Sequence, residues 1–157
     1  MARSVLPFAV LGLTLAAAGC GGAPPPAQLA GLWSVSPAAC AAGVGVRFGP
    51  NVIEAVYLSQ TETLFERPRY TLVDGGESMR IRVIYELPRL PGGVRSAGAR
   101  GVFVLAGQAD GRIAPVAHNL LDSRTGAVRL RVQNDPATAL LTLVACDPVR
   151  QQLRGRV

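Results

Sequence analysis

The 157-residue sequence has no lysine, a single histidine and few aromatic residues, which make up 5% of the chain. Its ten acidic residues are scattered, so side chains suited to acid–base catalysis are scarce. No phosphate-binding loop and no metal-ligand spacing is present. We therefore expect no enzyme, no catalytic residue, no metal and no cofactor.

A long apolar run is also missing. The uncharged segment 5–18 has fourteen residues, whereas a membrane-spanning helix needs about 20. Because it follows a short start that carries Arg3, the segment fits the apolar region of a secretory signal peptide.

The apolar run ends in Ala17-Ala18-Gly19-Cys20, which resembles the lipobox of bacterial lipoproteins. The resemblance implies that the Cys20 thiol receives a diacylglyceryl group, that the chain is cut before Cys20 and that fatty acids anchor it. The alternative is an ordinary signal peptide, cut after Ala16-Ala17-Ala18, that leaves Cys20 as a spare thiol. A free cysteine is a liability in an exported protein, which favours lipidation.

This interpretation divides the chain into a signal peptide (1–19), a lipidated tether (20–28) and one β domain (29–157). Glycines and three prolines in the tether are typical of an extended spacer. We expect a protein of the cell envelope that faces the periplasm. Gly21 follows the lipidated cysteine, which in this family permits sorting to the outer membrane rather than the inner one.

Cys40 and Cys146 are the two remaining cysteines. In an oxidising periplasm they are expected to form a disulfide that ties the start of the domain to its end. Metal binding by these two cysteines and the single histidine is disfavoured, because their spacing matches no known ligand set.

Several segments alternate between apolar and polar residues, the pattern of half-buried strands. In 78–86, for example, Met79, Ile81, Val83 and Tyr85 alternate with Arg80 and Arg82. About nine short strands are expected, at 32–36, 44–48, 51–58, 69–73, 78–86, 101–108, 112–118, 127–133 and 139–146. Turn sequences separate them at regular intervals, which predicts an all-β antiparallel barrel or sandwich. Asp147-Pro148 could begin a short C-terminal helix.

Gly31-Leu32-Trp33 opens the expected first strand. Together with a small antiparallel barrel and a disulfide that reaches the last strand, it resembles the calycin group, which includes lipocalins and barrel-shaped protease inhibitors. The resemblance implies that Trp33 plugs the closed end of the barrel under Arg150. The alternative is a core tryptophan of an unrelated β fold.

Without the signal peptide, fifteen arginines face ten acids, a net charge of +5. Arg89, Arg95 and Arg100 fall in a segment rich in glycine and proline, 87–100, expected to be an exposed loop that contacts an anion or a partner. His118 is expected to be a surface or structural histidine.

These observations predict a non-catalytic binding role, for a lipid-like small molecule or an envelope component, and no nucleic acid. The alternatives are a structural accessory of an envelope complex and an inhibitor of a periplasmic protease. A roomy apolar cavity would favour small-molecule binding, and an exposed apolar patch would favour the accessory role.

Overall fold

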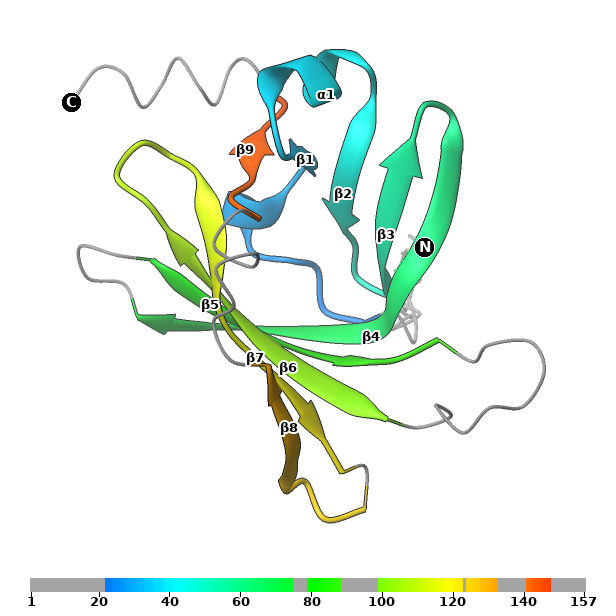
Figure 1. Cartoon of the computed structure of the whole chain (residues 1–157), viewed down its shortest axis with the longest axis vertical. Helices are drawn as coiled ribbons and strands as arrows, with labels where there is room; N and C mark the ends of the chain where they lie inside the picture. The colour runs from blue at the N-terminus through cyan, green and yellow to red at the C-terminus, as the bar shows by residue number, and fades with distance from the viewer. Residues whose placement is uncertain (1–21, 75–78, 89–98, 123, 133–140, 148–157) are drawn as a thin grey trace, which may run out of the picture.

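The structure is a computed structural model that describes residues 22–74, 79–88, 99–122, 124–132 and 141–147 (Figure 1). The predicted signal peptide and Cys20 lie outside these residues, as do Arg89, Arg95, Arg150 and nearly all of the expected C-terminal helix. No helix within the described ranges is long and apolar enough to cross a membrane.

The domain is all-β, as predicted. A 3-10 turn, η1 (Ala27–Leu29), and one short helix, α1 (Pro37–Ala41), accompany nine strands. The strands are β1 (Leu32–Ser34), β2 (Val44–Phe48), β3 (Val52–Tyr57), β4 (Gln60–Asp74), β5 (Arg80–Glu86), β6 (Arg100–Gly107), β7 (Ile113–Leu121), β8 (Val128–Val132) and β9 (Val144–Ala145).

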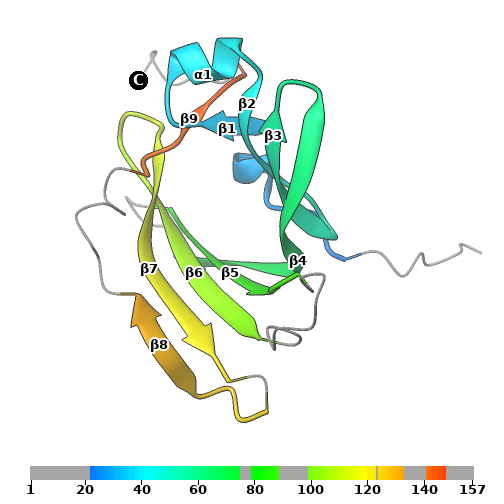
Figure 2. The ribbon, with the colours of Figure 1, turned by 45° about the vertical axis from the view of Figure 1, so that its right-hand side comes forward.

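The nine strands form one antiparallel sheet in the order β8-β7-β6-β5-β4-β3-β2-β1-β9. Leu143, directly before β9, exchanges two backbone hydrogen bonds with Ile113 at the start of β7, at 2.9 and 2.7 Å. Because β9 also pairs with β1, this bridge closes the sheet on itself. The sheet is therefore barrel-like rather than a sandwich, and β8 lies beyond the point of closure (Figure 2).

Alternation along the strands places apolar side chains on the inside of the curled sheet. In β5, Ile81, Val83 and Tyr85 are buried and Arg80 and Arg82 are exposed, which confirms the predicted period of two. The core cluster consists of Leu29, Trp33, Phe48, Ile53, Ile81, Val83, Tyr85, Phe103, Leu105 and Ile113. Burying each such side chain stabilises the fold by roughly 1.5–3 kcal/mol.

The predicted start of the fourth strand was wrong, because the strand begins earlier in the sequence. β4 begins at Gln60, nine residues before the predicted segment 69–73, and its first half pairs with β3. Its opening residues, QTETLFERP, contain two glutamates and a proline and few core residues. A strand with so little apolar alternation gives a weak sequence signal.

Helix α1 was not predicted, although its start signal is present. Ser36 is the N-cap, its Oγ accepts a hydrogen bond from the Ala39 amide at 3.1 Å, and Pro37 follows in the first turn. At five residues the helix is too short to show a helical apolar period.

The predicted disulfide between Cys40 and Cys146 is confirmed. Cys40 lies in α1, and Cys146 follows β9 and donates its amide to the Leu32 carbonyl at 2.8 Å. The bond closes a loop of 106 residues and fixes α1 to the strand that completes the curled sheet.

Candidate functional site

The chain enters the described domain beside a groove at one end of the sheet. The Gly22 amide donates to Oδ1 of Asn51 at 2.9 Å, in the turn between β2 and β3. The groove has a volume of about 770 Å³ and is lined by Gly22, Ala23, Pro50, Asn51, Arg67, Pro68, Arg69 and Tyr70. The first described residues of the predicted tether thus lie against the domain, next to two arginines.

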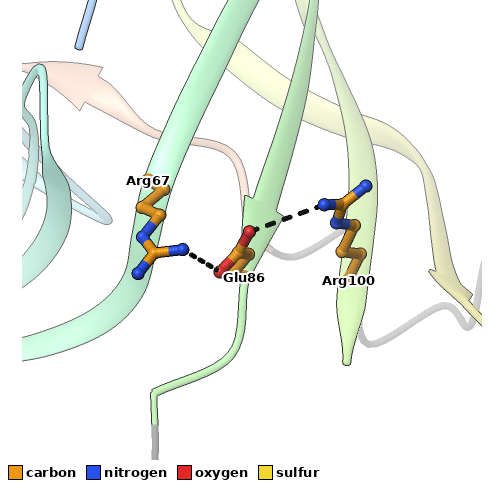
Figure 3. Close-up of polar contacts among 3 residues, drawn as sticks. All are labelled: Arg67, Glu86 and Arg100. Carbon is orange, nitrogen blue, oxygen red and sulfur yellow. Dashed lines mark hydrogen bonds and ion pairs between the residues drawn. The ribbon is translucent and has the colours of Figure 1, made fainter. Parts of the chain in front are cut away.

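A three-residue charge cluster lies next to this groove, on β4, β5 and β6 (Figure 3). Glu86 at the end of β5 faces Arg67 on one side and Arg100 on the other. Nη1 of Arg67 lies 3.1 Å from Oε2 of Glu86, and Nη2 of Arg100 lies 3.8 Å from Oε1. The Glu86 side chain is 25% exposed, whereas those of Arg67 and Arg100 are 76% and 51% exposed. Both guanidinium groups are therefore accessible from outside.

The backbone at Arg67 is unusual. Arg67 has a φ of 47°, in the left-handed region, and directly precedes the buried Pro68. It lies in a bulge of the β4–β5 ladder between Glu66 and Arg69, and its amide donates to the Asn51 carbonyl at 2.8 Å. A non-glycine residue in this region costs about 1–3 kcal/mol, and such residues cluster at functional sites.

Arg67 and Arg69 also line a second, smaller hollow of about 100 Å³. Its other lining residues are Ile84, Tyr85, Glu86 and Arg100. The two hollows therefore meet at the same pair of arginines, Arg67 and Arg69.

Tyr70 lines the groove and is hydrogen-bonded to the neighbouring turn. Its hydroxyl donates to the Gly49 carbonyl at 2.8 Å, and burial raises the pKa of the phenol well above its usual value. Tyr70 therefore stays neutral and fixes β4 against the β2–β3 turn.

Of the three arginines predicted to contact an anion or a partner, only Arg100 lies among the described residues. It is the first residue of β6 and not a loop residue as predicted, because it pairs with Glu86 across the β5–β6 ladder. Sequence reasoning did not assign Arg67, Arg69 or Glu86 to this site. A signal for them would require the register of three strands.

Trp33 is 1% exposed in the core, and its indole Nε1 donates to the Leu29 carbonyl at 3.2 Å. Leu29 itself is fully buried at the end of η1. The tryptophan therefore links the entering chain to β1. Its predicted partner Arg150 lies outside the described residues.

His118 lies on β7, where its Nε2 forms a 2.5 Å hydrogen bond with the hydroxyl of Tyr85. The rings of Phe65 and Phe103 pack around this pair. Burial lowers the pKa of His118 and raises the pKa of Tyr85 to about 12, so both groups are neutral at pH 7. This is the environment of a structural histidine.

The part of the chain that the structure describes contains no group of three or more His, Cys, Asp or Glu side chains that could hold a metal ion.

Comparison with known proteins gives no relative. No family model matches the chain, and neither a curated protein nor a solved structure matches it significantly. The function is therefore inferred from the site itself.

Proposed function

We propose that this chain is an exported envelope protein that is lipidated on Cys20 and binds another envelope component, without catalysis, through the arginine-bearing end of its β domain. The observation that carries the proposal is the contact of Gly22 with Asn51, beside Arg67. Gly22 is two positions after Cys20, so an anchor on Cys20 lies within about 7 Å of chain from the groove.

The disulfide supports the proposed periplasmic location. A Cys40–Cys146 bond persists in oxidising surroundings such as the periplasm and is rare in the cytosol. Since these two cysteines are paired, Cys20 is the one cysteine left for acylation.

The chemistry of the site favours binding over catalysis. A guanidinium is a planar, charged group with five N–H donors, so Arg67, Arg69 and Arg100 suit the binding of an anion. His118, the one histidine, lies among aromatic rings with Tyr85 as its partner.

The open groove favours a surface ligand as the bound component. Trp33, Tyr85 and Phe103 belong to one cluster of buried core side chains inside the sheet. The groove at Arg67 and Arg69 is open to the outside and adjoins the entering chain.

A calycin-like architecture remains part of this proposal. Its support is the Gly31-Leu32-Trp33 sequence at β1 and the closure of one antiparallel sheet by Leu143 and Ile113.

The Cys20→Ser variant tests the anchor. The wild-type protein is expected in the membrane fraction and in the detergent-rich phase on partitioning, whereas Cys20→Ser loses its acyl chains and its processing. The double variant Cys40→Ser/Cys146→Ser is the matched control, because it removes two cysteines and should keep acylation. Equal detergent partitioning and equal processing of wild type and Cys20→Ser would contradict the proposal.

One observation favours the alternative role as an accessory of an envelope complex. Tyr57 and Leu58, at the tip of the β3–β4 hairpin, are each 63% exposed, and Leu58 has a φ of 55°. An exposed apolar tip in a strained backbone suits a protein contact. A photocrosslinker at position 58 that captures one envelope protein in living cells, with position 62 as a silent control, would support this role.

A further inference from the structure

We propose that Arg67, Arg69 and Arg100 form a site for the phosphate group of an anionic membrane headgroup, and that the carboxylate of Glu86 occupies this site until phosphate displaces it. The inference rests on the proposed function, because the anchor supplies the membrane. It adds the ligand's chemistry and the internal competitor.

The donors outnumber the acceptor that now faces them. A guanidinium carries five N–H donors, so Arg67 and Arg100 together present ten to the two oxygens of Glu86. The Arg100 contact is long, at 3.8 Å, which marks an ion pair rather than a hydrogen bond. A headgroup phosphodiester carries one negative charge, like the carboxylate, and guanidinium groups bind its two unesterified oxygens in bidentate fashion.

The register of β4 and β5 brings Arg67 to Glu86. If the pairs from Arg69–Ile84 to Leu72–Ile81 continued without a bulge, Arg67 would lie opposite Glu86, whereas the bulge sets Glu66 there. Arg67, with a φ of 47°, still reaches Glu86 with its guanidinium at 3.1 Å. Counting Glu66, three arginines face two carboxylates, which leaves a net positive site.

The hollows give the ligand access. The small hollow, of about 100 Å³, is bounded by Arg67, Arg69 and Arg100 around Glu86. It meets the larger groove at Arg67 and Arg69, and Gly22 lies in that groove. A headgroup could therefore approach from the side on which the anchored chain enters.

The position of the entering chain decides the source of the phosphate. With Cys20 two residues from Gly22, the site lies at the bilayer surface, where headgroup phosphates are concentrated and attract basic residues. The described arginines near Glu86 thus meet a membrane headgroup in preference to free phosphate.

The test uses wild-type protein purified from membranes in neutral, phosphate-free detergent micelles. Phosphatidylglycerol is added to the micelles and its ³¹P resonance is titrated; glycerol 1-phosphate and inorganic phosphate are titrated in parallel. We expect saturable shifts with phosphatidylglycerol and with glycerol 1-phosphate. Shifts with the soluble phosphates but none with the lipid would overturn the assignment to a headgroup, and no shift with any of the three would overturn the site.

Three variants assign the effect to the site. Arg67→Gly keeps the left-handed backbone and should weaken phosphatidylglycerol binding on the order of fivefold, the equilibrium factor of an exposed ion pair. Arg112→Gln is the matched control, because Arg112 is also ion-paired, to Asp110 at 3.1 Å in the β6–β7 hairpin, and should leave binding unchanged. Glu86→Gln should tighten binding by a similar factor, a gain that misfolding cannot produce.

Weaker or unchanged binding in Glu86→Gln would contradict the role of Glu86 as competitor. If Arg67→Gly and Arg112→Gln lost the same amount of phosphatidylglycerol affinity, net charge alone would explain the binding, and the site would be overturned. The mass of the same wild-type sample reports acylation separately: an acylated protein that binds no phosphate rejects this site alone, and an unacylated protein that binds phosphate rejects only the anchor.

Discussion

The ring of Tyr85 occupies the space directly over Gly101, its partner in the β5–β6 ladder. A Cβ at position 101 would overlap the phenol carbons and the hydroxyl of Tyr85. An aromatic ring over a cross-strand glycine is a known device for fixing register in curved sheets. Here it also holds the Tyr85 hydroxyl at His118.

Gly101→Ala should therefore destabilise the fold by about 1–3 kcal/mol, because the Tyr85 ring must leave its place in the core. Gly107→Ala, on the same strand, is the control: a Cβ there approaches the flexible end of Met79 at 3.2 Å and meets the Met79 Cβ and carbonyl oxygen at ordinary contact distances of 3.4 and 3.6 Å. Thermal unfolding of both variants measures the difference. A melting temperature for Gly101→Ala equal to that of Gly107→Ala would show that Tyr85 has room to move.

The Cys40–Cys146 disulfide should account for a large share of the stability. For a loop of about 100 residues the chain-entropy estimate is about 4.7 kcal/mol, an upper value. We expect a clearly lower melting temperature for Cys40→Ser/Cys146→Ser and for the wild type in reductant. Melting temperatures that do not respond to reductant would argue against the bond in solution.

His118 should make stability depend on pH. Burial lowers its pKa in the folded protein, so the unfolded chain binds the proton more readily. The contribution of His118 to the unfolding free energy is fully present above the pKa of the unfolded chain, about 6.5. It is lost as the pH falls through the pKa that His118 has in the folded protein. In His118→Gln the slope of unfolding free energy against pH, just below about 6.5, should flatten; an unchanged slope would assign the pH dependence to other groups.

Leu58 should be a position where substitution stabilises the protein. Its φ of 55° is strained for leucine but is readily adopted by glycine. Because its side chain is 63% exposed, removing the side chain loses little packing. Leu58→Gly is expected to raise the unfolding free energy by about 1 kcal/mol. Leu72→Gly, at a half-exposed leucine in β4, is the contrast and should lower it.

The sequence predicted those parts of the fold that depend on local patterns. Alternation identified the buried face of β5, and turn sequences were expected between the strands. One such turn follows β7, where the Asp122 amide donates to the Ala127 carbonyl and the Asp122 carboxylate accepts from the amides of Arg124 and Thr125. The pairing of Cys40 with Cys146 followed from their number and compartment.

The candidate site could not be predicted in the same way. Arg67, Glu86 and Arg100 lie on three strands, and only the pairing of those strands brings them together. That pairing has no local sequence signature. The first half of β4 was missed for a related reason, since its outward face is polar and its pairing with β3 is set by the hairpin at Leu58.

The mass of the intact wild-type protein, extracted from the membrane fraction of its native host, tests the central claim most directly. The account predicts a chain that begins at Cys20, carries a diacylglyceryl group on the thiol and a further acyl chain on the amino group, and has Cys40 and Cys146 oxidised. A water-soluble protein that retains residues 1–19 and has a free thiol at Cys20 would contradict it.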